Sequence, residues 1–159
     1  MAATSLIDFD SIDLNTPIAS HDEIYAELKQ AGSFALLDNV LHYSAEDKLV
    51  VGSKEIKDSD WWAADHIPGR PLFPGALMIE AGAQLCTWDF MRRREDDSDV
   101  FVGFGGLNKT RFRGVVEPGS TMIFAGNVLR IRKTLFTYSV QGFVDQKLVF
   151  ETEVIGVVL

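Results

Sequence analysis

Apolar positions at helical spacing predict one short helix in the first part of the chain. Ser20 and Glu23 have the spacing of a capping box, in which each side chain satisfies a backbone N–H of the other residue. Ile24 and Leu28 lie four residues apart on one face, and a glycine just beyond them supplies a stop signal. The pattern therefore predicts a helix over residues 21–31.

The clearest helix extends from Gly75 to about Met91. It is apolar on nearly every face, and a helix of this kind is buried on most of its sides rather than lying on a surface. Only four polar residues interrupt it: Glu80, Gln84, Thr87 and Asp89. This pattern predicts a long central helix within the core.

The remainder of the chain is rich in strand-forming residues, and the turn sequences E-P-G and D-Q-K punctuate its second half. Between the first strands and the long helix, three prolines exclude a helix and predict a loop over residues 57–74. The expected strands cover residues 34–43, 48–56, 100–112 and 121–132, the alternating positions 136–141, and residues 146–158.

These elements predict an α+β protein in which an antiparallel sheet of roughly five or six strands wraps around one long helix. That arrangement is the hot-dog fold. A length of 159 residues suits a single domain, residues 1–159. Residues 1–19 show no sustained period and are expected to form an extended or loosely held lead-in.

Composition and charge argue against several classes of protein. A formal net charge of −8 disfavours a nucleic-acid binder, because affinity for phosphate backbones depends on Lys and Arg. The sequence has no signal-peptide pattern and no apolar run long enough to span a membrane, so we expect a cytoplasmic protein without a membrane partner. Cys86 is the only cysteine, which excludes an intrachain disulfide and fits a reducing compartment.

Basic residues are nevertheless concentrated in one part of the chain. Nine of the fifteen lie between Arg92 and Lys133. Two interpretations stay open. In the first, the basic residues form one face that steers an acidic partner toward the protein. In the second, Arg92–Arg94 only stabilise the C-terminus of a helix, and the other basic residues are solvated positions on strands.

The segment from His66 to Glu80 carries the candidate chemistry. A carboxylate inside an apolar helix is costly to bury without a partner, and Gln84 lies one turn further on, where it can hydrogen-bond to Glu80. The amide of Gly75, at the helix start, is suited to hold a developing oxyanion. His66 precedes a proline-stiffened loop that returns to that helix start, and imidazole is the usual base near neutral pH. Each residue alone is compatible with a structural role, but a base, an acid and an oxyanion donor together suit β-elimination beside a thioester carbonyl.

The complete string H-x-P-G-x-P-x-x-P-G, with a glutamate fourteen residues after the histidine, resembles the 3-hydroxyacyl-[acyl-carrier-protein] dehydratases of type II fatty-acid synthesis. Residues 80–84 read E-A-G-A-Q and match the E-A-x-A-Q that follows in that family. The resemblance covers about residues 21–158, and its other blocks are residues 106–113, 115–119 and, more weakly, 34–38.

The resemblance implies a role for each residue of the candidate site. His66 is then the catalytic base and Glu80 completes the dyad, with the two residues coming from different subunits of a dimer. The Gly75 amide binds the thioester carbonyl, the Leu72 carbonyl orients the imidazole, and Gln84 lies beside the acid. The implied assembly is a homodimer or a trimer of dimers.

The resemblance also implies the partner and the product. The substrate is presented on the phosphopantetheine of an acidic acyl carrier protein, and no metal or other cofactor is expected. The carrier would dock at a basic rim for which the candidates are Lys109, Arg111 and Arg113. The implied product is a trans-2-enoyl thioester.

Three departures from the family pattern leave the acyl chain length and the carrier open. Gln30 and Ala31 stand where the family usually has His-Arg, Ala63-Ala64-Asp65 replaces aromatics followed by Gly, and Asn108 replaces Asp. Two alternative functions also stay open, namely a hot-dog acyl thioesterase and a non-catalytic acyl-binding module of the same fold. The proline loop that begins at His66 favours the dehydratase, because a thioesterase does not need it.

Overall fold

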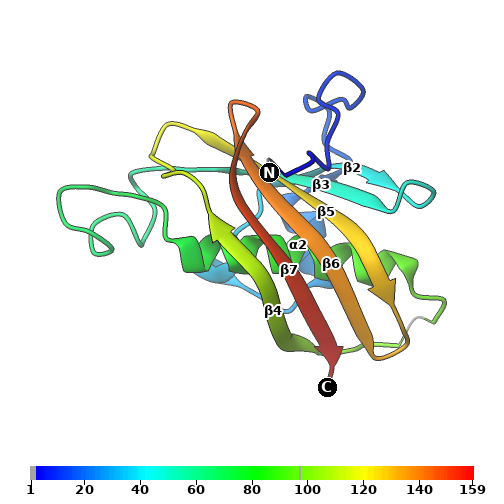
Figure 1. The fold of residues 1–159 in the computed structure, drawn as a ribbon. Coiled ribbons are helices and arrows are strands. Elements are labelled where there is room, and N and C mark those ends of the chain that lie inside the picture. Colours follow the sequence, from blue (N-terminus) through cyan, green and yellow to red (C-terminus); the bar gives the residue numbers. More distant parts are fainter. Residues whose placement is uncertain (1–2, 97) are drawn as a thin grey trace.

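The long apolar helix α2 (Gly75–Arg93) lies against one face of a seven-stranded antiparallel sheet that curves around it (Figure 1). The computed structural model describes residues 3–96 and 98–159 of the chain. Two smaller helical segments precede α2: α1 (His21–Glu27) and the 3-10 turn η1 (Gly32–Phe34). The predicted α+β hot-dog fold is confirmed.

The strands of the sheet do not follow one another in chain order. In their order across the sheet they are β1 (Ala19–Ser20), β2 (Asn39–Ser44), β3 (Leu49–Glu55), β5 (Thr121–Ile131), β6 (Leu135–Val144), β7 (Lys147–Val158) and β4 (Val102–Phe112). Strand β4 therefore forms one edge of the sheet. Asp145 and Gln146 have φ angles of 49° and 64°, so the β6–β7 hairpin closes on the left-handed two-residue turn that suits twisted strands.

The prediction of a helix over residues 21–31 is wrong at its end. The capping box at Ser20 and Glu23 is present, but α1 stops at Glu27 because Leu28 is extended, with φ −85° and ψ 157°. The side chain of Leu28 is buried in the core. The glycine at position 32, with φ 58°, opens the 3-10 turn instead of ending the helix.

The prediction of a strand over residues 34–43 is wrong in its first half, because β2 begins only at Asn39. Backbone groups of residues 34–37 are bound by side chains rather than by another strand. Gln84 bonds to the carbonyl of Phe34 and to the N–H of Leu36, and a tyrosine hydroxyl accepts from the next N–H. A segment whose backbone groups are satisfied in this way has no need of a strand partner. The sheet nevertheless has more strands than expected, because the two-residue β1 leaves no pattern in the sequence.

The core lies between α2 and the inner face of the sheet. Leu85 and Phe90 of the helix are buried with Phe124, Phe136 and other aromatic residues of the strands. The helix comes very near the sheet at Gly82, where a Cβ atom would lie 2.8 Å from Cγ1 of Val140. Although α2 is strongly apolar, no helix among the described residues is long and apolar enough to cross a lipid bilayer.

The last turns of α2 are fixed by a buried polar cluster around Asp89, which is fully buried. Its carboxylate accepts two hydrogen bonds from Arg93, of 2.6 and 3.3 Å, and a third from the hydroxyl of Tyr138. Arg93 also donates to the carbonyls of Ser44 and Ala45 at the β2–β3 turn. The cluster therefore joins the helix to two separate parts of the sheet.

Replacing Asp89 with alanine is expected to lower the free energy of unfolding by about 3–5 kcal/mol, because the Arg93 guanidinium is left largely buried without its partner. Thermal or urea unfolding measures this loss. Asp99→Ala is a matched control, since Asp99 forms a short ion pair with Lys29 on the exposed surface and such pairs contribute little. Equal effects of the two variants would contradict a stabilising role for the buried cluster.

The lead-in, residues 3–18, contains turns rather than one extended segment, and it is anchored rather than loose. Ile7 is buried against the outer face of the sheet, and the ring of Phe9 meets Phe143 edge-on at 5.2 Å. The side chain of Gln141 accepts from the N–H of Leu6 and donates to the carbonyl of Thr4. The lead-in thus covers apolar residues on the side of the sheet that faces away from α2.

Candidate active site

His66 lies on the long loop that joins β3 to α2. Its Nδ1 atom is 2.8 Å from the carbonyl oxygen of Leu72, and its side chain is exposed. A carbonyl oxygen can only accept, so Nδ1 carries the hydrogen and the Nε2 lone pair of the neutral ring is free. A histidine held in this tautomer can act as a base through Nε2.

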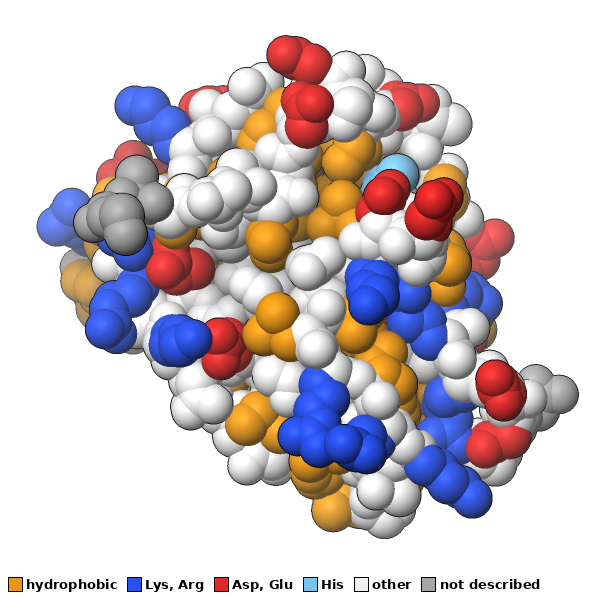
Figure 2. Space-filling view, turned by 45° about the vertical axis from the view of Figure 1, so that its right-hand side comes forward, with side chains coloured by type: hydrophobic (Ala, Val, Ile, Leu, Met, Phe, Trp, Pro, Cys, Tyr) orange, Lys and Arg blue, Asp and Glu red, His pale blue; other side chains and the backbone are white. Residues whose placement is uncertain are grey.

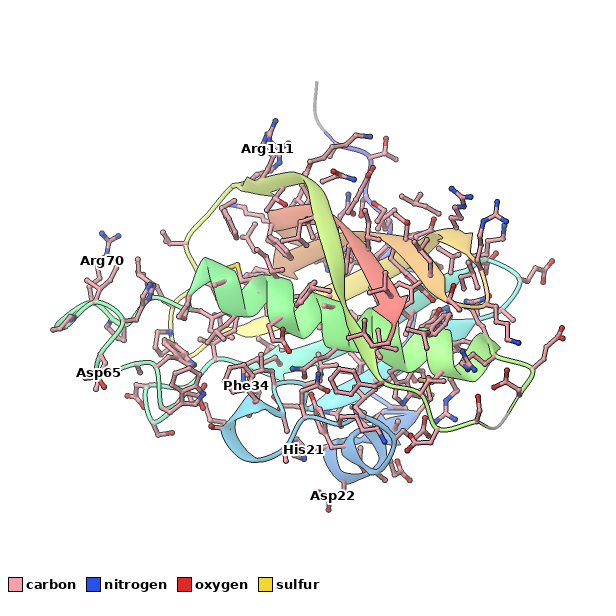
Figure 3. The ribbon with its side chains drawn as sticks, turned by 90° about the horizontal axis from the view of Figure 1, so that it is seen from below. His21, Asp22, Phe34, Asp65, Arg70 and Arg111 are labelled. Carbon is pink, nitrogen blue, oxygen red and sulfur yellow. The ribbon has the colours of Figure 1, made fainter. Side chains whose placement is uncertain are left out.

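The loop around His66 is held by aromatic residues at its start. The indole Nε1 of Trp61 donates to the carbonyl of Ser33 at 3.1 Å, and its ring stacks on Phe34 with a centroid distance of 6.1 Å. Trp62 is buried against Phe73. The tip of the loop, with Asp65 and Arg70, projects beyond the N-terminal end of α2 (Figure 3).

Helix α2 begins at Gly75 without a side-chain cap. Its N-cap is Pro74, which makes no side-chain hydrogen bond, and no acidic residue occupies the first turn. The first N–H groups of a helix have no intrahelical carbonyl partner, so they are available to an oxygen atom of a ligand. Glycine is needed here because a Cβ atom at this position would lie 2.8 Å from the ring of Phe112.

Glu80 is half-buried one and a half turns into α2, about 7.5 Å along the helix axis from Gly75. Its Oε1 atom accepts a hydrogen bond of 2.9 Å from Nε2 of Gln84, the contact that the sequence predicted. Gln84 itself is 1% exposed, so this contact is shielded from water on the side of the amide.

The side chain of Glu80 lines a recess between α2 and the edge of the sheet. Its walls are formed by the helix, by β4 and by β6 and β7. The residues that line it are Gln30, Glu80, Ala83, Gln84, Thr87, Val102, Gly103, Phe104, Phe136, Val154, Ile155 and Gly156. Of the departures from the family pattern, only Gln30 borders this recess, whereas Ala31, Ala63, Asp65 and Asn108 do not.

The structure brings the predicted residues together in two pairs rather than in one group. His66 contacts Leu72, and Glu80 contacts Gln84. Within the described part of the chain, no hydrogen bond joins the imidazole to the carboxylate, and His66 does not line the recess of Glu80. Within one chain, therefore, the candidate base His66 and the candidate acid Glu80 do not form a single site.

The basic residues proposed from the sequence as a rim do not form an unbroken positive surface. Lys109 and Arg113 of the β4 region bond to Glu153 and Glu151 of β7, at 3.0 and 2.8 Å. Arg111 projects from the far end of β4 (Figure 3) and bonds through its guanidinium only to the carbonyl of Thr110 among the described residues. On the face drawn in Figure 2, several Lys and Arg side chains gather in the lower half, whereas most acidic side chains lie in the upper half or at the margins.

Comparison with known families places most of the chain in one of them. The family model described as "FabA-like domain" matches residues 28–153. A 3-hydroxyacyl-[acyl-carrier-protein] dehydratase FabZ of Syntrophobacter fumaroxidans is 33% identical over 125 residues, which are 79% of this chain and 84% of that protein. A "Bifunctional enzyme LpxC/FabZ" of Chlorobaculum tepidum is 29% identical over 79% of this chain, but the match spans only 27% of that longer protein.

Solved structures with the same fold include both dehydratases and thioesterases. The dehydratase heterocomplex ApeI:P of Xenorhabdus doucetiae aligns with a TM-score of 0.71 at 17% identity, over 86% of this chain and 90% of that one. A mutant of the thioesterase PA1618 of Pseudomonas aeruginosa aligns with a TM-score of 0.67 at 14% identity, over 89% and 95%. At these identities the similarity establishes the fold alone.

Proposed function

The chain belongs to the FabA-like dehydratase family, and from this we propose that it removes water from 3-hydroxyacyl thioesters and releases trans-2-enoyl thioesters. The observation that carries the proposal is the hydrogen bond of His66, whose Nδ1 is held by the Leu72 carbonyl so that Nε2 carries the lone pair of the neutral ring. A fixed tautomer on a loop that leads directly to an uncapped helix start suits a base acting beside a bound carbonyl.

The proposed reaction divides its proton transfers between two side chains. Nε2 of His66 takes the proton from C2 of the substrate, while the Gly75 amide donates to the thioester oxygen, where negative charge develops. Glu80 gives its proton to the 3-hydroxyl group, the C3–O bond breaks, and water leaves as the C2–C3 double bond forms. His66 then holds one extra proton and Glu80 lacks one, and exchange with solvent restores both. No metal or other cofactor is needed for these steps.

We propose that the active site is completed in a homodimer, because the base and the acid do not meet within one chain. Among the described residues the edge strand β4 has one unpaired side, and it exposes Phe104, Leu107 and Phe112, of which Phe104 also lines the recess of Glu80. An exposed apolar edge of this kind is a surface that a second copy can cover. A trimer of such dimers would satisfy the same requirement.

We further propose that the substrate arrives on the phosphopantetheine of an acyl carrier protein, as part of fatty-acid biosynthesis in the cytoplasm. The named activity of the dehydratase relative supports this carrier. Of the three basic candidates for the docking rim, Arg111 is the strongest, since Lys109 and Arg113 already bond to glutamates of β7.

The direct test is to incubate the chain with 3-hydroxyacyl thioesters of several lengths, on carrier protein and on coenzyme A, and to follow loss of water by mass. We expect the enoyl thioester to form with the thioester bond intact. Release of free thiol and a 3-hydroxy acid would instead identify a thioesterase. No change in any substrate would favour the non-catalytic acyl-binding module.

Replacing Glu80 with glutamine is expected to leave the protein folded but to slow dehydration by about 10²–10⁴-fold, because an amide keeps the side-chain volume but cannot deliver the proton. Turnover and thermal unfolding are measured on the same preparation. A structural role for Glu80 predicts the reverse result, a lowered unfolding midpoint with turnover preserved in the folded fraction.

A further inference from the structure

A chain of side-chain hydrogen bonds extends from Glu80 to a tyrosine outside the matched family segment. The hydroxyl of Tyr25, on α1, donates to Oε1 of Gln84 at 2.6 Å, and Nε2 of Gln84 donates to Oε1 of Glu80 at 2.9 Å. We infer that Tyr25 is a positioning residue for dehydration, acting on the Glu80 carboxyl group through Gln84. This inference rests on the proposed function, since it gives Glu80 the role of the acid.

The direction of every hydrogen bond in this chain is determined. The N–H of Leu37 donates to the Tyr25 hydroxyl at 2.8 Å, so the single hydroxyl hydrogen is directed to Gln84. The N–H of Leu36 donates to the same atom of Gln84, at 3.3 Å, and only the amide oxygen can accept two donors. The amide of Gln84 therefore has one possible orientation.

The orientation of the Gln84 amide determines which of its atoms faces the Glu80 carboxyl group: the NH₂ group, which donates a hydrogen bond. The two hydrogens of Gln84 Nε2 are directed to the carbonyl of Phe34, at 2.9 Å, and to Oε1 of Glu80. Oε1 is thus always an acceptor, so the transferable proton of the acid belongs on Oε2. The network selects the carboxyl oxygen that can give a proton to the substrate.

Tyr25 is well placed to hold this orientation. Burial raises the pKa of its hydroxyl, so the group stays protonated and remains a donor throughout the neutral range. Helix α1 is itself held by the Ser20–Glu23 capping box, and the neighbouring side chain of Ile24 is fully buried. Tyr25 lies before residue 28, where the match to the FabA-like family begins, so the family match does not assign it a role.

Tyr25→Phe removes one hydroxyl group and is expected to lower kcat for dehydration about 10-fold while KM changes less than about twofold. Without the hydroxyl, the amide oxygen of Gln84 keeps only the longer of its two hydrogen bonds, the one from the N–H of Leu36. The amide and the Glu80 carboxyl group are then held less firmly, and small displacements of a reacting group lower the rate steeply. Tyr25 itself is not among the residues that line the recess, so substrate binding, and with it KM, is expected to change little.

The matched control is Tyr138→Phe, which also removes a buried hydroxyl that bonds to α2, but at Asp89 near the other end of the helix. It is expected to lower the unfolding midpoint and to leave kcat of the folded protein unchanged. If both tyrosine variants lose kcat equally, the effect of Tyr25 is a general consequence of lost stability and the inference is wrong.

A double-mutant cycle tests whether Tyr25 acts through Gln84. Gln84→Met removes the amide, and in this background Tyr25→Phe is expected to have almost no further effect on kcat. If the two losses simply multiply, Tyr25 acts by another route and the inference fails. Dehydration by the unaltered chain is measured first: its absence would reject the proposed function itself, whereas an active chain with an unaffected Tyr25→Phe variant would reject only the role of Tyr25.

Discussion

Replacing His66 with alanine is expected to reduce dehydration by about 10²–10⁴-fold while the unfolding midpoint stays close to that of the unaltered chain. The side chain is exposed, and within the described part of the chain its one hydrogen bond is to the carbonyl of Leu72, so the fold loses little when it is removed. The reaction, by contrast, loses its proposed base for the proton on C2. Steady-state turnover and thermal unfolding of the same preparation test both halves of this expectation.

His42→Ala is the control for this experiment. His42 lies on β2, is half-buried, and is neither on the loop of His66 nor among the residues that line the recess of Glu80, so its removal should leave turnover unchanged. Full turnover in His66→Ala would disprove the assigned role of His66. Reduced turnover in both variants would indicate a non-specific effect of losing a histidine.

The parts of the candidate site that the sequence predicted are local in the chain. His66 and the carbonyl of Leu72 are six residues apart, and Glu80 and Gln84 are four residues apart on one helix. The contact between Glu80 and Gln84 follows from helix geometry, whereas the contact between His66 and Leu72 was implied by the family resemblance. The pairing of acid and amide, and the free helix start at Gly75, could therefore be read from spacing.

The parts that the sequence did not predict depend on residues distant along the chain. Residues 34–38 have the composition of a strand, but Gln84, almost fifty residues later, binds their backbone. Tyr25 was not predicted to matter because the hydrophobic pattern identified only Ile24 and Leu28 on its helix. A polar contact between a short helix and a long one leaves no periodic signal in either.

The net charge of the predicted docking rim also depends on residues that are distant along the chain. Lys109, Arg111 and Arg113 are close in sequence and were predicted to act together. Strand β7 places Glu153 and Glu151 beside Lys109 and Arg113, so the net charge of this region depends on which strands are neighbours. Charge patterning along one segment does not reveal the strand that pairs with it.

Mixing His66→Ala subunits with Glu80→Gln subunits is expected to restore dehydration that neither variant performs alone. In a symmetric dimer whose sites each take the base from one chain and the acid from the other, a mixed dimer contains one intact site and one site that lacks both residues. Random exchange makes about half of the dimers mixed, so roughly one quarter of the unaltered activity should return. Recovery is followed as turnover against time after mixing, with subunit exchange confirmed by native mass spectrometry.

The control for subunit mixing is a chain that carries both substitutions. When His66→Ala subunits are mixed with this double variant, no arrangement of two subunits contains both an intact base and an intact acid, so activity should not return. Recovery in the first mixture alone would therefore demonstrate shared sites, because instability or altered exchange would affect both mixtures. If confirmed mixed dimers of the two single variants stay inactive, His66 and Glu80 must act within one chain.

In that case the loop that carries His66 would have to move toward the recess of Glu80, since the two side chains are not in contact within the described part of a single subunit.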